Sequence, residues 1–122
     1  MSSGQLRLNL IEGSVSFSFT PQAAQEFKRA IASLMESLKV AANPGGVSGG
    51  NRPKPQPPME FQYTGDIFLE VFCNPNIWPS PFAAKVLITL RDDRIRLTTE
   101  AELTRIIEDL NQYLDQFGHT AT

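Results

Sequence analysis

The sequence predicts an α+β fold of two layers, in which two amphipathic helices cover one face of a mostly antiparallel sheet of about five to six strands. Several short segments place apolar residues at every second position, which predicts strands with one wet face. Two longer segments place apolar residues at spacings of three and four, which predicts helices that bury one side. The length of 122 residues suits a single domain, 1–122, with one hydrophobic core.

The first strands are expected within residues 5–19. Apolar and polar residues alternate in both halves of this segment, with the apolar positions at Leu6, Leu8, Leu10, Val15, Phe17 and Phe19. Glu12 and Gly13 lie between the halves and are compatible with a tight hairpin turn. One long strand with a glycine bulge is the alternative, and the sequence leaves both open.

A helix and a linker complete the first half of the chain. Thr20 is a good N-cap and Pro21 suits the first helical position, while an apolar stripe runs through Phe27, Ile31, Leu34 and Leu38. Residues 43–58, NPGGVSGGNRPKPQPP, read as an exposed crossover linker that is flexible first and extended later. The alternative is that PKPQPP is itself a ligand for an aromatic-lined groove.

The second half predicts a block of strands and a final helix. Strands are expected over residues 59–63, 67–73 and 82–90, followed by a half-exposed edge strand after the Asp92-Asp93 turn. Thr99 and Glu102 have the spacing of a capping box, which predicts a helix over residues 100–117. Its apolar stripe comprises Leu103, Ile106, Ile107, Leu110, Leu114 and Phe117.

Residues suited to catalysis or metal binding are scarce. The only histidine, His119, follows the last expected helix, and Cys73, the only cysteine, has the parity of a buried strand residue. An ordinary zinc site cannot form from these two residues, and no phosphate-binding motif is present. The acidic pairs Asp92-Asp93 and Glu108-Asp109 are expected to be solvated. We therefore expect no enzyme activity, no metal and no cofactor.

Composition also indicates the compartment and the class of partner. The net charge of −2 lacks the basic excess that nucleic-acid binding needs. A single cysteine suits a reducing compartment, and the chain shows neither a secretory signal nor an apolar run long enough to span a bilayer. We expect a soluble cytoplasmic protein.

Residues 67–82, IFLEVFCNPNIWPSPF, carry the strongest functional indication. A strand between helices and water should alternate apolar with polar residues, yet Phe68 and Phe72 have the parity of the wet face. Leu87 and Ala83 have the same parity in the next strand. Large side chains left in water forgo about 1.5 to 3 kcal/mol each, so something should cover this face.

The adjoining loop is rich in aromatic residues and stiffened by proline, as in recognition loops. We predict a partner-binding surface that consists of Phe68, Phe72, Ile77, Trp78, Phe82 and Leu87. Three covers are possible for it: the chain's own loops, a second copy of the chain, or another protein.

Three functions follow from the possible ways of covering the apolar face and from the basic residues beside it. The first is a non-catalytic adaptor or assembly chaperone that recognises a segment of another protein. The second is a structural homodimer whose interface is the outer sheet face. The third is weak nucleic-acid binding through Lys85, Arg94, Arg96 and Arg7, although the strand lacks the pattern of an RNA-recognition motif.

Residues 59–114, from MEFQYTGDIFLEVFCNPN through RIRLTTEAELTRIIEDLNQYL, resemble small proteins of cyanobacteria, and in particular the carboxysome shell-assembly factors. The resemblance lies in overall texture and involves no diagnostic motif. It implies an assembly chaperone that binds an extension of a shell protein, and it assigns no binding residue.

Overall fold

The first part of the chain folds as a hairpin followed by a long helix. The computed structural model describes residues 4–42 and 55–118. The elements of the first part are β1 (Gln5–Asn9), β2 (Ser14–Ser18) and α1 (Pro21–Ala42). Most of the expected linker, residues 43–54, and His119 lie outside the described residues.

The second part contains four strands, two short 3-10 turns and a helix. In chain order these are β3 (Met59–Thr64), β4 (Phe68–Cys73), η1 (Pro75–Ile77), η2 (Pro81–Ala83), β5 (Lys85–Arg91), β6 (Arg96–Glu102) and α2 (Leu103–Phe117). The strand expected from Phe82 thus begins three residues later, because Pro81 starts a 3-10 turn.

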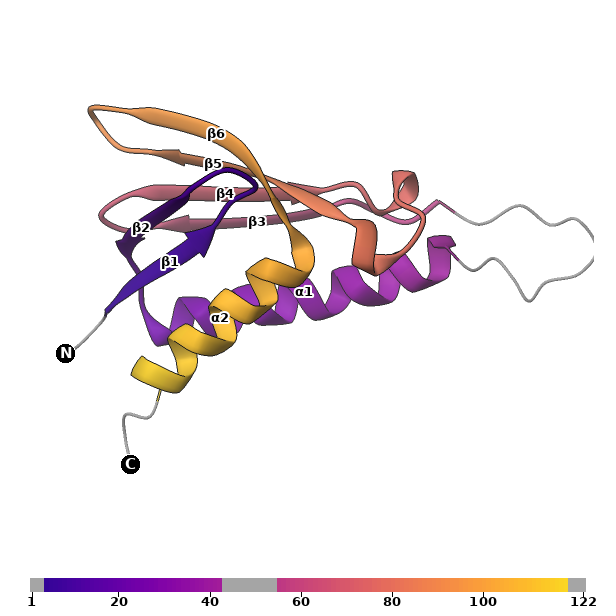
Figure 1. Ribbon diagram of the computed structural model, residues 1–122, viewed down its shortest axis with the longest axis horizontal. Coiled ribbons are helices and arrows are strands. Elements are labelled where there is room, and N and C mark those ends of the chain that lie inside the picture. Colours follow the sequence, from indigo (N-terminus) through magenta and orange to yellow (C-terminus); the bar gives the residue numbers. More distant parts are fainter. Residues whose placement is uncertain (1–3, 43–54, 119–122) are drawn as a thin grey trace, which may run out of the picture.

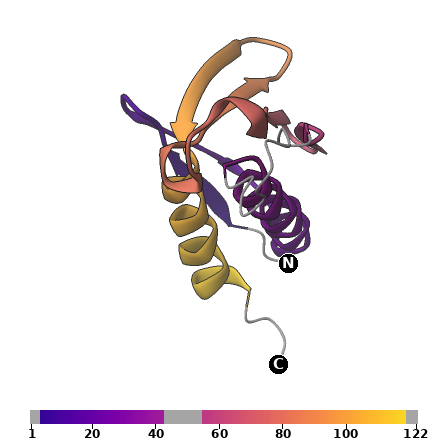
Figure 2. The ribbon, with the colours of Figure 1, turned by 90° about the vertical axis from the view of Figure 1, so that its right-hand side faces the viewer.

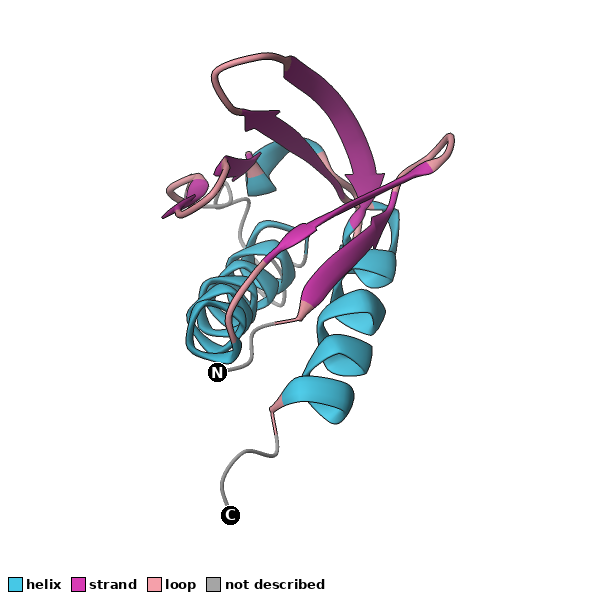
Figure 3. Ribbon diagram, turned by 90° about the vertical axis from the view of Figure 1, so that its left-hand side faces the viewer, coloured by secondary structure: helices cyan, strands magenta, loops and turns pink. Residues whose placement is uncertain are grey.

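The α+β class is confirmed, with antiparallel strands throughout. The six strands divide into a hairpin, β1-β2, and a four-stranded sheet in the order β3-β4-β5-β6. Figure 1 shows both helices on one side of the four-stranded sheet, and Figure 3 shows the hairpin crossing above them. Among the described residues, no helix is both long and apolar enough to cross a membrane.

The structure decides between the two readings of residues 5–19 in favour of the hairpin. Leu6 lies opposite Phe17 and Leu8 lies opposite Val15 in an antiparallel pair. The turn closes through the N–H of Leu10, which donates to the carbonyl of Gly13 at 2.8 Å. Gly13 has a φ of 94°, a value that strongly favours glycine, so this residue makes the turn possible.

Helix α1 begins and packs as the sequence predicts. The hydroxyl of Thr20 accepts the N–H of Ala23 at 3.1 Å, which satisfies one of the free donors of the first turn. The expected stripe of Phe27, Ile31, Leu34 and Leu38 is buried. The ring of Phe27 stacks on Phe61 of β3 with centroids 4.5 Å apart, so the stripe ties the helix to the sheet.

The predicted capping box of α2 is wrong. Thr99 lies within β6 opposite Ile88, and the strand continues to Glu102, which makes no side-chain cap. The helix begins at Leu103, whose N–H donates to the carbonyl of Ala84 at 3.0 Å. Strand pairing with β5 therefore overrides the local capping signal and supplies an acceptor from another element.

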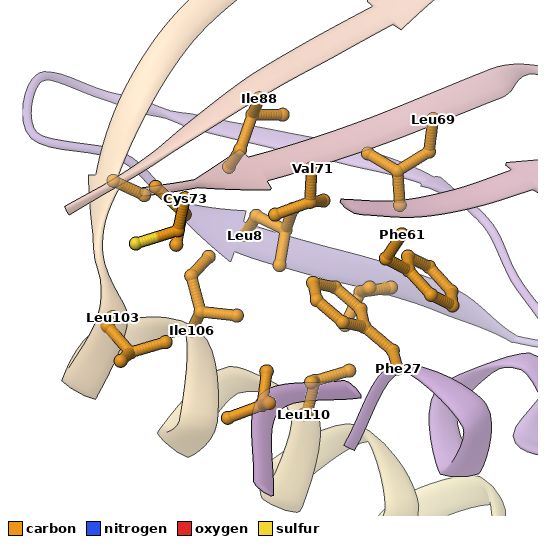
Figure 4. Packing of buried hydrophobic residues seen from close by; sticks show 14 of the residues in the cluster. Leu8, Phe27, Phe61, Leu69, Val71, Cys73, Ile88, Leu103, Ile106 and Leu110 are labelled. Carbon is orange, nitrogen blue, oxygen red and sulfur yellow. The ribbon is translucent and has the colours of Figure 1, made fainter. Parts of the chain in front are cut away.

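One hydrophobic core lies between the sheet, the hairpin and the helices. Figure 4 shows labelled side chains from β1, α1, β3, β4, β5 and α2 meeting in this interior. Its largest fully buried side chains are Phe19, Phe27, Leu6, Leu8, Leu34, Leu38, Leu69, Ile88, Leu103, Ile106, Leu110 and Val71. Tyr113, which the stripe omitted, is also buried, and its hydroxyl donates to the carbonyl of Phe19 at 2.8 Å.

Asp109 corrects the expectation that Glu108 and Asp109 are both solvated. Asp109 is only 4% exposed, and its two carboxylate oxygens accept the backbone and side-chain N–H groups of Asn9, each at 2.8 Å. Hydrogen bonds of this kind compensate a buried carboxylate for its lost hydration. The pair joins the end of β1 to α2 and thereby fixes the position of the hairpin.

Replacing Asn9 by Ala should lower the free energy of unfolding by about 1 to 3 kcal/mol, because Asp109 would stay buried with one of its hydrogen bonds gone. Urea unfolding followed by circular dichroism measures the change. Asn111→Ala, at an exposed position of the same helix, is the control and should change stability by less than about 0.5 kcal/mol. Equal effects of the two substitutions would contradict this role of Asn9.

Candidate functional site

Strand register arranges the outer face of the four-stranded sheet, the face turned away from the helices, in three rows. From β3 to β6 the rows are Glu60-Phe72-Leu87-Glu100, Gln62-Glu70-Thr89-Thr98 and Thr64-Phe68-Arg91-Arg96. The apolar residues lie in the two outer rows, and the middle row is polar. The face is therefore not the continuous apolar surface that the strand sequence suggested, although Phe68 and Phe72 do lie on it.

Phe68 is partly covered by its own sheet. It lies opposite Arg91 of β5, and the guanidinium carbon of Arg91 is 4.5 Å from the centre of the ring. This is a cation–π contact, which is worth about 0.5 to 1 kcal/mol at an exposed site. Glu70 separates Phe68 from Phe72 along the strand. Phe68 thus belongs to a different part of the face from the other predicted anchors.

The loop that carries Trp78 is held in place by a side-chain amide. The amide nitrogen of Asn76 donates to the carbonyl of Gln56, and its oxygen accepts the N–H of Gln56, both at 2.8 Å. The side chain of Asn74 accepts the N–H of Asn76 at 3.0 Å, and Pro75 is buried against the body of the protein. A loop ordered before binding loses less entropy when a partner docks.

Four of the predicted anchors surround one hollow of about 200 Å³. Phe72 and Leu87 come from the sheet, and Ile77 and Trp78 come from the loop. Ile77 is 65% exposed and Leu87 is 41% exposed, whereas Trp78 is half-buried and packs against the core. The hollow therefore exposes apolar side chains to water, and its base is already held in place by the packing of Trp78 against the core.

A second hollow, of about 410 Å³, continues from the first across β6. Leu87 and Glu100 line both hollows, and the far wall is the hairpin turn with Ile11 and Glu12. The N–H of Ile11 donates to the carbonyl of Glu100 at 3.3 Å, which holds the turn against the sheet edge. We call the two hollows together the outer trough; its lining consists of Ile11, Glu12, Phe72, Cys73, Asn74, Ile77, Trp78, Lys85, Leu87, Thr98, Thr99 and Glu100.

Ile11 is the site residue that the sequence reading missed. It is 49% exposed at the tip of a hairpin, where polar residues are usual. An apolar residue in the turn segment Ile11-Glu12-Gly13 was the only signal available. Its closeness to Leu87 could not be anticipated, because the hairpin reaches β6 through tertiary packing alone.

Phe82 does not join the other predicted anchors. It lies in η2, which packs beside the start of α2, and it lines neither hollow of the outer trough. At 82% exposure it makes few contacts of any kind. The outer trough therefore contains Phe72, Ile77, Trp78 and Leu87 of the predicted set.

Carboxylates dominate the rim of the outer trough. Glu12 and Glu100 line it, and Glu60 lies directly across the strand pair from Phe72. Among the described residues that line the trough, Lys85 is the only cationic one, and it faces Glu102 across the β5-β6 pair. Within residues 4–42 and 55–118, the ion pair Lys39–Glu36 is the only one within 4 Å, so none of these carboxylates is neutralised in this way.

Cys73 is a buried residue at the base of the trough, as its strand parity predicted. Burial raises the pKa of the Cys73 thiol. The neighbouring indole N–H of Trp78 lowers this pKa by a smaller amount, although the N–H is not within hydrogen-bond geometry of the sulfur. A raised pKa reduces the thiolate fraction at neutral pH, which disfavours a nucleophilic role.

A separate polar groove of about 430 Å³ runs beside α2. Its lining includes Asn9, Arg105, Glu108, Asp109 and Asp115. In the described part of the chain, no group of three or more His, Cys, Asp or Glu side chains could hold a metal ion. The carboxylate of Asp109 in this groove is already hydrogen-bonded to Asn9, so its burial is explained by the contact between β1 and α2.

Comparisons of the chain with family models, with curated proteins and with solved structures found no match.

The thiol of Cys73 should react with Ellman's reagent at least about tenfold more slowly in the folded protein than in urea, because burial both limits access and raises the thiol pKa. The rate in urea, compared with that of a short peptide thiol, is the control. A native rate equal to the rate in urea would show that Cys73 is exposed and available for chemistry.

Proposed function

We propose that this chain is a non-catalytic protein-binding module that recognises a segment of another protein in the outer trough. The observation that carries the proposal is the grouping of exposed Ile11, Ile77 and Leu87 with half-buried Phe72 and Trp78 in one preformed depression. Apolar anchors in a depression with a polar rim are typical of protein interfaces.

The shape of the trough supports an extended segment or one face of a helix as the ligand. It runs from the Trp78 loop across β5 and β6 to the hairpin turn, and thus lies across the strands. Because adjacent strands are about 4.8 Å apart, a path over three strands and both walls spans about 15 to 20 Å. That length accommodates about five or six extended residues.

An assembly role would follow if the resemblance to carboxysome shell-assembly factors extends to function. The ligand would then be an extension of a shell protein, and the cytoplasm would be the site of action. Both points belong to the proposal and rest on the resemblance of residues 59–114.

Leu87→Asp should reduce capture of a partner by at least about tenfold, or 1.4 kcal/mol, since it places a charge on the apolar base of the trough. The measurement is affinity capture from the source cell, quantified by mass spectrometry and repeated with peptides from the captured protein. Leu87 is preferable to Trp78 for this test because Trp78 also packs against the core.

Val40→Asp is the matched control, because Val40 is 47% exposed on α1 and lies outside the trough. A protein captured by wild type and Val40→Asp but lost with Leu87→Asp supports the proposal. Equal capture by all three forms, with folding confirmed by circular dichroism, would contradict it.

Phe82→Ser should leave capture within about twofold of wild type, since Phe82 lines neither hollow of the trough. Binding of peptides from the captured protein, measured by fluorescence anisotropy, gives the comparison. A loss as large as that from Leu87→Asp would extend the binding surface to η2.

A further inference from the structure

The hairpin between β5 and β6 presents an exposed apolar residue among arginines. We call Arg91, Arg94, Ile95 and Arg96 the basic tip; Ile95 is 65% exposed. The carboxylate of Asp92 accepts the N–H groups of Arg94 and Ile95 at 2.8 and 2.9 Å, so the turn is well defined. The tip stands away from the helix layer, as Figures 1 and 2 show.

The basic tip carries three arginines; Asp92 and Asp93 lie in the same turn, and the Asp92 carboxylate attracts Arg94, whereas Arg91 and Arg96 lack such a partner among the described residues. Arg91 and Arg96 lie directly opposite one another in the β5-β6 pair, and like charges in this position repel. Neither has an ion pair within 4 Å in the described part of the chain, although Arg91 contacts the Phe68 ring. An anionic surface placed over the tip would relieve this repulsion.

The outer trough is an anionic surface on the same face of the same sheet. The trough contains the row of Phe72, Leu87 and Glu100. The row of Phe68, Arg91 and Arg96 lies four residues further along the strands, so the two rows are about 13 Å apart. One end of the outer face is thus acidic and partly apolar, and the other end carries Arg91 and Arg96. The face is complementary to itself when reversed.

We infer that two copies of this chain pack with their outer faces together, each placing its basic tip in the outer trough of the other. A two-fold axis that lies across the strands, over the row of Gln62, Glu70, Thr89 and Thr98, produces this arrangement. Such a contact is isologous and closes as a dimer.

The register predicts which rows meet in the dimer. Glu100 faces Arg96 of the second copy, and Leu87 faces the aliphatic stem of its Arg91. Glu100 and Arg96, which have no ion pair within 4 Å in the described part of the monomer, therefore find partners of opposite charge.

The axis also identifies one unfavourable pair. Glu70 lies in the middle row, so the two Glu70 carboxylates approach one another across the axis. With a polar middle row and few apolar anchors, the dimer is expected to be reversible and to weaken as salt increases. Glu70→Gln should strengthen the dimer because it removes this repulsion. Gln62, which donates a hydrogen bond to Glu70, can still donate to the side-chain amide oxygen of the new glutamine.

Charge reversal tests the arrangement directly. Glu100→Arg alone and Arg96→Glu alone should each be monomeric, because each places like charges at both copies of the contact. An equimolar mixture of the two should form a heterodimer, since every reversed charge then meets its opposite. Sedimentation velocity over a concentration series at low salt, with native mass spectrometry to identify the mixed species, measures the outcome.

Each result decides the question. A wild-type dimer, monomeric single variants and a mixed heterodimer support the inference. Lys39→Glu reverses a charge at an exposed position of α1 and is the control; a dimer that dissociates with this substitution would count against the inference. A monomeric wild type, single variants that remain dimeric, a mixture that stays monomeric, or species larger than a dimer would overturn it.

This inference uses the same trough as the proposed function but fails separately from it. A monomeric wild type that still loses a partner with Leu87→Asp would leave the proposed function standing alone. A dimer restored by mixed charge reversal, in a chain that captures no other protein, would leave only the dimer. If both hold, a partner must displace the basic tip of the second copy from the trough.

Discussion

Antiparallel pairing of β4 with β5 and of β5 with β6 sets Phe72, Leu87 and Glu100 in one line across the sheet. Because side chains alternate between the faces of a strand, a shift of one residue in either pair would move Leu87 or Glu100 into the core. The buried residues on the opposite parity, such as Val71 and Ile88, prevent that shift. The outer surface is therefore held in register by the hydrophobic packing beneath it.

The hairpin position depends on polar contacts that are remote in sequence. Asn9 binds Asp109 of α2, and two residues later Ile11 binds the carbonyl of Glu100 at the sheet edge. Gly13 lets the chain reverse between these contacts and β2. One wall of the trough is thus positioned by the final helix, so binding in the trough and docking of α2 are structurally connected.

Features decided by local pattern could be predicted, and those decided by tertiary contacts could not. The fold class and the buried stripe of α1 followed from residue spacing. The start of α2 did not, because β5 extends the pairing of β6 through Glu102. Asp109 has the composition of a solvated residue and is buried only because Asn9 reaches it. Of the predicted surface, Phe72, Ile77, Trp78 and Leu87 meet, whereas Phe82 is displaced by the second 3-10 turn.

The two hydrogen bonds between Asn76 and Gln56 require a particular side chain at position 76. Gln56 contributes its backbone N–H and carbonyl, which every residue except proline possesses, whereas Asn76 contributes a side chain that donates and accepts at once. Aspartate has the same length but lacks the donor, and glutamine carries both groups one methylene further out. Natural variants of this protein that keep the tryptophan loop in this shape should accordingly retain asparagine at 76.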